Sequence, residues 1–315
     1  MSKRMADIVG GCASLAALLE VSAYPKPGNV HRVRDFPDTK YEHFLASSVS
    51  LGPKMQYIAE KSHRINKGSR DWSELGIGES ILTAVNDMMK WQSGGNVHLG
   101  IILLFSPLAA AAGSVMDENQ VDLDELRKSL YTIIEGATPQ DSVNIYRAID
   151  VAMSAENLGA VEQLDVTDTS SLDIILEEEI TPLDIFNECG GMDTICSEWI
   201  TGFKVTFTEG YPFLRERLDE GANINGATVD TFINILSEHP DSLIKRKRGI
   251  EEASAVSEKA KTIIQTGGAS SEVGMKMIYE LDDELRKENG SLNPGTTADL
   301  TAASLFLLLL SGWRP

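Results

Sequence analysis

The sequence predicts an all-α protein that folds as a single large multi-helix domain over residues 1–315. Three observations support this fold class. Apolar residues recur with helical periodicity along almost the whole chain, and no convincing run of alternating β pattern appears. No internal repeat, low-complexity tract or long Pro/Ser linker divides the chain, and the acidic, turn-rich segment 156–189 is the weakest candidate boundary.

Three of the predicted helices have clear start signals. Asp122 precedes LDELRKSL, the pair Thr138-Pro139 precedes QDSVNIYRAI, and Thr296 and Thr297 precede ADLTAASLFLLLL. In chain order, the predicted helices cover residues 5–23, 42–63, 73–93, 99–112, 122–134, 141–155, 190–208, 211–219, 227–238, 251–265, 270–288 and 297–312.

Two of these helices are strongly apolar. The segment HLGIILLFSPLAAAAG is apolar on every side, which predicts a buried central helix that Pro107 kinks or splits. The run Ala109–Ala112 lets a neighbouring helix approach closely. The stretch Leu300–Trp313 is too short to span a bilayer, and we expect it to form a buried terminal helix.

The chain is strongly acidic, with a net charge of −19 at pH 7. Because this mean field repels phosphate, the charge excludes general binding of nucleic acids or of anionic membranes. A nucleotide site needs only local positive charge, so the negative net charge does not exclude one. Met5–Glu20 lacks a signal-peptide pattern, so we expect a cytoplasmic protein.

The three cysteines, Cys12, Cys189 and Cys196, form no CxxC pair. Neither a disulfide framework nor a zinc knuckle is therefore indicated. Cys189 and Cys196 are seven residues apart, a spacing that puts both on one face of a helix. We expect them to be buried thiols.

Four loops interrupt the helical pattern and concentrate polar residues: YPKPGNVHRVRD, SGGNVHLG, HPDSLIKRKRG and NPGTTADL. In the first loop, Pro25 and Pro27 fix φ, and Gly28 permits a positive φ. Lys26 therefore has little backbone freedom to lose when it binds a ligand. The alternative is an ordinary surface turn.

In the second loop, Gly94 and Gly95 precede Asn96 and His98 at the start of the apolar helix. Free N–H groups at the start of a helix are typical of an anion site. The alternative is that the glycines form a C-cap for the preceding helix and that His98 is a hydrogen-bonded core residue.

The third loop contains the basic run Lys245–Arg248, which either contacts phosphate or lies on a solvated face. If this run is helical, at most two of its side chains face one ligand. In the fourth loop, Thr296 and Thr297 lie at a helix start and Asp299 in its first turn. Helix capping explains these residues, but they would also suit a sugar hydroxyl, a phosphate or a metal.

No GxxxxGK[ST], strand-led GxGxxG, HExxH or GxSxG motif is present, so phosphate binding would need an unusual helical architecture. Together, however, the loops resemble the triphosphoribosyl-dephospho-CoA synthase family. The similar segments, in the same order from Glu20 to Leu310, are EVSAYPKPGNV, FLASS, GGNVHLG, DSLIKRKRG and LNPGTTADL.

The chain departs from the bacterial synthases at three places. Val97 replaces a threonine of the Asn-Thr-His core, Thr296 replaces the second glycine of Pro-Gly-Gly, and DFPDTKYEHF replaces a Gly-x-His-x-Asp segment. In that last segment Asp38 matches the acidic residue, but no histidine has a counterpart. The sequence therefore resembles a divergent, archaeal-type branch that shares the reaction class and takes either dephospho-CoA or a related acceptor.

The resemblance implies a reaction between ATP and 3′-dephospho-CoA. Adenine is released, and the triphosphoribosyl group is joined to a ribose 2′-hydroxyl. The expected partners are thus ATP and a dephospho-CoA-like acceptor, with no nucleic acid and no membrane, and a homo-oligomer is compatible with the sequence. Two alternatives stay open: another nucleotide N-ribosyl transferase or N-glycoside hydrolase, and a non-catalytic helical protein that binds a nucleotide.

The resemblance also implies roles for residues in the matching motifs. Asp241 and Asp299 are expected to be catalytic residues that hold Mg²⁺ and contact the triphosphoribosyl group, kept ionised by helix dipoles. His98 and His31 are candidates for protonating adenine. The residues expected to bind substrate and phosphate are Lys26, Gly28, Asn29, Ser47, Asn96, Lys247, Arg248 and Thr296.

Overall fold

The computed structural model describes residues 3–116, 120–153, 169–287 and 290–315. In these ranges the secondary structure is helical with no β-strand, which confirms the predicted all-α fold. The helices are α1 (Lys3–Ser22), α2 (Tyr41–Lys67), α3 (Ile77–Trp91), α4 (Leu99–Val115), α5 (Leu123–Glu135), α6 (Pro139–Ala152), α7 (Thr169–Glu177), α8 (Pro182–Cys189), α9 (Thr194–Thr201), α10 (Tyr211–Asp219), α11 (Ile224–Glu238), α12 (Ser242–Arg248), α13 (Ile250–Gln265), α14 (Glu272–Arg286) and α15 (Gly295–Leu310).

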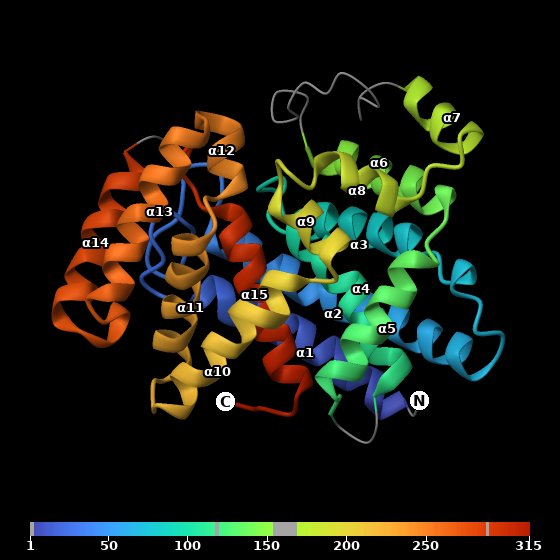
Figure 1. Cartoon of the computed structure of the whole chain (residues 1–315), viewed down its shortest axis with the longest axis horizontal. Coiled ribbons are helices and arrows are strands. Elements are labelled where there is room, and N and C mark those ends of the chain that lie inside the picture. The colour runs from blue at the N-terminus through green and yellow to red at the C-terminus, as the bar shows by residue number, and fades with distance from the viewer. Residues whose placement is uncertain (1–2, 117–119, 154–168, 288–289) are drawn as a thin grey trace.

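The centre of this helical body consists of α1, α2, α4 and α15, which pack against one another (Figure 1). Both α4 and α15 are buried along nearly their whole length. The rings of Phe105 in α4 and Phe306 in α15 are in contact, with 4.6 Å between their centroids. The predictions of a buried central helix and a buried terminal helix are confirmed.

A second apolar cluster lies beside this centre and is formed largely by α11, α13 and α14 (Figure 1). Ala23, just after α1, belongs to the cluster, and the N–H of Gly28 donates to Asp282 of α14. We call residues 23–31 the strap. The strap connects the first helix of the chain to the group of helices near its end.

One predicted helix, at 73–93, begins later than expected. A 3-10 turn at Trp72–Glu74 comes first, and α3 starts only at Ile77. Gly76 separates the two because it adopts a left-handed φ of 60°, which a continuing helix does not allow. The predicted helices other than this one and that at 190–208 agree with the observed ones to within about one turn.

The predicted helix at 190–208 is wrong as a single element. Its first residues form a turn, and α9 ends at Gly202, which has a left-handed φ of 59°. Phe203 also has a positive φ, of 58°, and a π-helical turn at Thr206–Gly210 then leads into α10. A left-handed residue after the last helical turn is a common way for a helix to end.

Three observed helices, α7, α8 and α12, were not predicted. α8 begins with a capping box, in which Thr181 Oγ1 accepts from the N–H of Asp184 and the Asp184 carboxylate accepts from the N–H of Thr181. Pro182 occupies the first helical position, where proline is favoured. These signals lie in the segment considered turn-rich, of which residues 154–168 fall outside the described part.

Pro107 does not split α4, which continues from Leu99 to Val115. Because proline has no N–H, the carbonyl oxygen of Leu103, four residues earlier, loses its helical donor. The indole N–H of Trp199 in α9 donates to this oxygen, with a nitrogen–oxygen distance of 3.2 Å. The buried tryptophan thus satisfies the carbonyl group that the proline leaves unpaired.

Within the described residues, Met5–Ser22 of α1 is the one helical stretch long and apolar enough to cross a membrane. Half of this stretch is buried in the fold, where α1 packs against α2 and α15. The contact with α2 is close, since a Cβ on Gly10 would lie 2.6 Å from the carbonyl oxygen of Gly52. Its hydropathy is accounted for by this packing.

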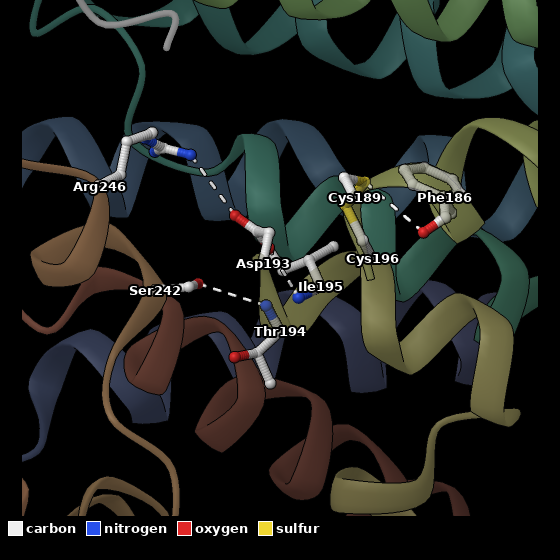
Figure 2. Close-up of a disulfide and its surroundings, with 8 residues drawn as sticks. All are labelled: Phe186, Cys189, Asp193, Thr194, Ile195, Cys196, Ser242 and Arg246. Atoms are coloured by element: carbon white, nitrogen blue, oxygen red, sulfur yellow. Dashed lines mark hydrogen bonds and ion pairs between the residues drawn. A yellow bond between two sulfur atoms is a disulfide. The ribbon is translucent and has the colours of Figure 1, made fainter. Parts of the chain in front are cut away.

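Cys189 and Cys196 form a disulfide, which corrects the expectation of buried thiols (Figure 2). The two residues do not share a helix. Cys189 ends α8, a turn at Gly190–Met192 follows, and Cys196 lies in α9. The turn brings the two Cα atoms to 5.9 Å from each other, within the range that a disulfide spans. Cys12 is a free, buried thiol.

The role of Trp199 can be tested with Trp199→Phe, which keeps an aromatic ring but removes the donor to Leu103. We expect a loss of about 1–3 kcal/mol in the free energy of unfolding, measured by urea denaturation, because a buried carbonyl is left unpaired. Trp313→Phe is the control, since the Trp313 indole N–H has no partner among the described residues. Equal effects of both substitutions would contradict the assignment.

Candidate functional site

The strap is buried, which excludes the alternative of an ordinary surface turn. Residues 25–31 are all buried, and Lys26 is 0% exposed. Gly28 has a φ of 69°, which confirms the predicted positive φ. A Cβ at Gly28 would lie 2.7 Å from the Cβ of Leu285, so only glycine fits there. The strap therefore presents Lys26 to the interior of the fold.

The Lys26 ammonium is paired inside the protein. It forms an ion pair with the buried carboxylate of Glu20 in α1 and donates to Asn29 Oδ1 over 3.1 Å. Burial lowers the pKa of Lys26 and raises the pKa of Glu20, and each charge opposes the shift of the other. These contacts use two of the three donors of the ammonium, and its Nζ also lies over the Phe232 ring, 5.9 Å from the centroid.

Asp282 of α14 anchors the strap. Its Oδ1 accepts from the N–H of Gly28 and its Oδ2 from Arg34 Nη1, each over 2.9 Å. His31 Nδ1 accepts from the N–H groups of Val33 and Arg34, and its Nε2 lies 3.7 Å from Asp282 Oδ2. One ring nitrogen is thus held by the turn that follows His31 and the other faces Asp282, which favours a structural role for His31 over the predicted proton transfer.

Asn29 joins the strap to the loop before α15. Its Nδ2 donates to Asn293 Oδ1 over 2.9 Å, and its backbone oxygen accepts from the guanidinium of Arg286. The first and the fourth polar loops of the sequence are therefore in direct contact. Residues more than 250 positions apart in the sequence meet beside Lys26.

Asp241 is a helix cap whose oxygens are both occupied. Oδ1 accepts from the N–H groups of Leu243 and Ile244 at the start of α12, and Oδ2 accepts from the N–H and the hydroxyl of Thr297 in α15. These four bonds use the acceptor capacity of the carboxylate. The contacts favour a capping role and leave little room for the predicted Mg²⁺.

Asp299 differs from Asp241 because its oxygens are free. It lies in the first turn of α15, is mostly but not fully buried, and has no hydrogen bond or ion pair with the residues that the structure describes. Gly100, in the first turn of α4, faces it, and a Cβ there would lie 2.0 Å from Asp299 Oδ2. A side chain at position 100 would therefore cover this carboxylate.

The electrostatic surroundings of Asp299 disfavour its charge. Burial, followed by the charges of Glu20, Asp241 and Asp193, raises the pKa of Asp299 well above its usual value, and Lys26 opposes the shift. Burial also raises the pKa of Asp241, although its donors oppose this. At both aspartates, burial therefore acts against the ionisation that the helix dipoles are expected to favour.

His98, at the start of α4, is buried and 1% exposed. Its Nδ1 lies 2.7 Å from the hydroxyl of Ser47 in α2, and its Nε2 has no hydrogen-bond partner in the described structure. Burial, and then the charge of Lys26, lowers the pKa of His98 to about 3. The imidazole is therefore neutral at neutral pH and suits hydrogen bonding better than acid catalysis.

Two further residues of the predicted site have structural contacts. The exposed Asn96 accepts from the N–H of Leu99 over 3.0 Å and thereby caps α4. The hydroxyl of Thr296 in α15 accepts from the hydroxyl of Ser242 in α12 over 2.9 Å. Capping and helix–helix contact account for both residues, and their predicted substrate contacts stay predictions.

The basic run lies in the last turn of α12 and contacts the turn between α8 and α9 (Figure 2). Lys245 Nζ donates to the carbonyl oxygen of Gly191 over 3.2 Å. Arg246 Nη1 lies 3.4 Å from Asp193 Oδ2. Because the run is helical, its four side chains divide between this turn and other directions.

Lys247 and Arg248, the predicted phosphate ligands, are exposed at the end of α12. Partial burial of the ammonium and the charge of Arg246 lower the pKa of Lys247, and the charge of Asp241 opposes this. Lys247 is therefore near enough to Asp241 for their charges to interact. We place it at the rim of the site.

The predicted residues thus fall into two groups. An interior group surrounds Lys26, whose charge acts on His31, His98 and Asp299. The interior residues are Lys26, Gly28, Asn29, His31, Ser47, His98, Asp241, Thr296 and Asp299, while Asn96, Lys247 and Arg248 are exposed.

Four residues of this region were missed as site candidates. Glu20 and Asn293 lie inside the quoted motifs EVSAYPKPGNV and LNPGTTADL, so a signal for them was present. Asp193 and Asp282 lie in no such motif. Only the packing of the turn after α8 and of α14 brings them to the site, and no local pattern predicts that.

The region fits a Mg²⁺ ion that arrives with a nucleotide. Among the described residues no group of three or more His, Cys, Asp or Glu side chains is arranged to hold a metal. Magnesium at nucleotide sites takes one or two carboxylates together with phosphates and water, so a complete cage is not needed. Asp299 meets this requirement because its oxygens are free and because a cation would offset the repulsion from the neighbouring carboxylates. Asp241 does not meet it, since its oxygens are occupied.

The pKa of His98 makes stability depend on pH. The folded pKa of about 3 lies below the unfolded value of about 6.5, so the unfolded chain binds more protons between these pH values. The stabilisation is complete above about pH 6.5 and is lost as the pH falls toward 3, by at most about 1.4 kcal/mol per pH unit. His98→Gln should flatten the slope of unfolding free energy between pH 7 and 5, and an unchanged slope would contradict this burial.

A comparison of the sequence with models of protein families finds a match over nearly the whole chain. The model of the CitG family, described as ATP:dephospho-CoA triphosphoribosyl transferase, matches residues 6–315. A probable 2-(5″-triphosphoribosyl)-3′-dephosphocoenzyme-A synthase 1 of Salmonella typhimurium (strain LT2) is 23% identical over 308 residues, which are 97% of this chain and 92% of that protein. The corresponding synthase of Klebsiella pneumoniae is 22% identical over 305 residues, covering 96% and 90% of the two chains.

A solved structure shares the fold. It is the crystal structure of a protein from Archaeoglobus fulgidus described as a triphosphoribosyl-dephospho-CoA synthase, with a TM-score of 0.64 and 28% identity. The match covers 86% of this chain and 100% of that one. The family match extends over nearly all residues, including all four polar loops that meet at the buried cluster. The chain belongs to the CitG family of ATP:dephospho-CoA triphosphoribosyl transferases.

Proposed function

We propose that the site around Lys26 and Asp299 transfers the triphosphoribosyl group of ATP to the ribose 2′-hydroxyl of 3′-dephospho-CoA, or of a related acceptor, and releases adenine. The observation that carries this assignment is the free carboxylate of Asp299. It lies in the field of Lys26, at the point where the strap, α4 and α15 meet. Membership of the family supplies the class of reaction.

The reaction breaks the N-glycosidic bond of ATP, and the electron pair of that bond leaves with adenine. Positive charge develops at C1 of the ribose, and a nearby carboxylate stabilises it, as in glycoside hydrolysis. A proton is delivered to adenine, and the acceptor hydroxyl loses one. Asp299 is the residue whose position and free oxygens suit contact with the triphosphoribosyl group.

The triphosphate needs positive charge, which two sources supply. The third N–H of the Lys26 ammonium donates to the triphosphate from inside the fold, and the side chains of Lys247 and Arg248 donate to it from the rim of the site. Asp299 would hold Mg²⁺ together with the phosphates, and the ion would supply further positive charge there. His98 keeps a neutral imidazole next to Lys26, which suits a hydrogen bond to the substrate through its unpaired Nε2.

We further propose that the protein acts in the cytoplasm, where ATP is available as substrate. A homo-oligomer is compatible with the proposed reaction. The acceptor is proposed at the level of a dephospho-CoA-like molecule that carries a free ribose 2′-hydroxyl.

The two aspartates should respond differently to removal of charge. Asp299→Asn should lower adenine release from ATP by about 10²-fold or more, because the residue proposed to face the reacting ribose can then neither ionise nor transfer a proton. The variant should stay at least as stable as wild type, since a buried carboxylate near three others is removed. Chromatography of adenine and mass spectrometry of the acceptor product give the readout.

Asp241→Asn should give the opposite pattern. An amide cannot accept at both ends, so the bonds to α12 or to Thr297 are lost and the free energy of unfolding falls by about 1–3 kcal/mol. Asp219→Asn, on the exposed surface of α10, is the control for both variants. If Asp299→Asn releases adenine at the wild-type rate, the proposed site is wrong. Adenine that forms without the acceptor would identify a hydrolase.

The double substitution Lys247→Gln and Arg248→Gln tests the rim. If both side chains bind the triphosphate, removing each charge-assisted hydrogen bond should weaken ATP binding by about 1.5–3 kcal/mol. The salt dependence of binding should also become flatter, because fewer ion pairs form with the phosphates. Calorimetric titration of ATP at two salt concentrations measures both effects, and unchanged affinity would assign the two residues to the solvated surface.

A further inference from the structure

The turn closed by the Cys189–Cys196 disulfide contacts the helices that build the site (Figure 2). Gly191 accepts from Lys245 of α12 over 3.2 Å, and Asp193 pairs with Arg246 of α12 at 3.4 Å. The turn therefore touches two successive residues of the basic run.

The same turn reaches α15 and α4. The N–H of Thr194 donates to the hydroxyl of Ser242 over 3.4 Å, and that hydroxyl donates to Thr296 of α15 over 2.9 Å. The side chain of Ile195 faces Gly100 of α4, the residue that Asp299 also faces. The Asp193 carboxylate is close enough to Asp299 for the two charges to interact.

The disulfide adds a covalent link to the non-covalent contacts that hold this turn. The turn begins with Gly190 and Gly191, whose backbones are permissive, and the next side chain, Met192, is 61% exposed. Its backbone is closed by N–H groups of Met192 and Asp193 that donate to the carbonyl oxygen of Cys189. A covalent link across the turn removes the freedom that its glycines would otherwise have.

We propose that the disulfide-closed turn, residues 189–196, is a wall of the nucleotide site, that Asp193 is a positioning residue on it, and that reduction of the disulfide weakens nucleotide binding. This inference rests on the proposed function, because it takes the site beside Asp299 to be the nucleotide site. Asp193 acts through Arg246 of α12, with which it pairs.

The redox step needs an external dithiol. A thiolate of the dithiol attacks one sulfur of the bridge and releases the other cysteine. The second thiol of the reagent then attacks the mixed disulfide and releases the first cysteine. Cys189 and Cys196 each gain a thiol proton, and the dithiol becomes a disulfide, so two electrons and two protons are transferred. The bridge is within reach of a small dithiol because Cys189 is only partly buried and lies beside exposed residues.

The test compares ATP binding by calorimetry before and after treatment with dithiothreitol, with thiol titration to verify that two further thiols appear. We expect the Kd for Mg-ATP to rise about tenfold on reduction. Without the disulfide the turn has more conformational freedom, and the loss of this freedom when the ligand binds costs binding free energy. The double variant Cys189→Ser and Cys196→Ser should have the raised Kd without reductant and no response to it. Cys12→Ser is the matched control and should respond like wild type.

Asp193→Asn separates positioning from stability. It should raise the Kd of the oxidised protein, and reduction should add little further, because both changes act through the same turn. If the disulfide only stabilises the fold, its reduction would lower the melting temperature. The Kd for Mg-ATP would then stay unchanged at temperatures well below the unfolding transition. That result overturns the inference.

The failure of this inference can be told from failure of the proposed function. If the oxidised protein binds ATP and releases adenine, and complete reduction changes neither, the turn is not a wall of the site and the proposed reaction stands. If the oxidised wild-type protein neither binds Mg-ATP nor releases adenine with any acceptor, both proposals fall together.

Discussion

The buried charge of Lys26 is the constraint on which the rest of the structure depends. An ammonium removed from water is tolerated only when a carboxylate and further acceptors surround it. Glu20, at the end of α1, and Asn29, in the strap, supply these partners. Removing one member of such a pair typically costs about 3–5 kcal/mol, so the end of α1 and the path of the strap are fixed together.

The carboxylates around this charge divide into those that are occupied and one that is free. Glu20 is paired, Asp241 accepts four hydrogen bonds, and Asp282 anchors the strap, whereas Asp299 has unused oxygens. Occupied groups hold helices in place, and a free group in a buried, charged setting is poised for a ligand. Carboxylate side chains thus have two roles in this protein, holding helices in place and binding a ligand, and the packing around each carboxylate decides which role it has.

Sequence reasoning identified the helices and the loops of the site because both have local signals, such as periodicity and the Pro-Lys-Pro-Gly strap. It failed where the outcome depends on contacts between distant segments. Trp199 donates to Leu103, 96 residues away, within an α4 that stays continuous. Sequence reasoning also failed at the short turn between Cys189 and Cys196, which breaks the helix expected there and joins the two cysteines in a disulfide. The raised pKa of Asp299 was not predicted, because its burial and its carboxylate neighbours are not visible in a local pattern.

The contacts of the strap have a consequence for how the chain assembles. Gly28 and Asp282 are 254 residues apart, and Asn29 and Asn293 are 264 apart. Contacts of such long range close large loops and therefore form late in folding. During synthesis the strap emerges long before α14 exists, so Lys26 stays hydrated until the C-terminal helices dock. A chain that stops before α14 would leave the strap without its anchor, although every residue of the first motif would already be present.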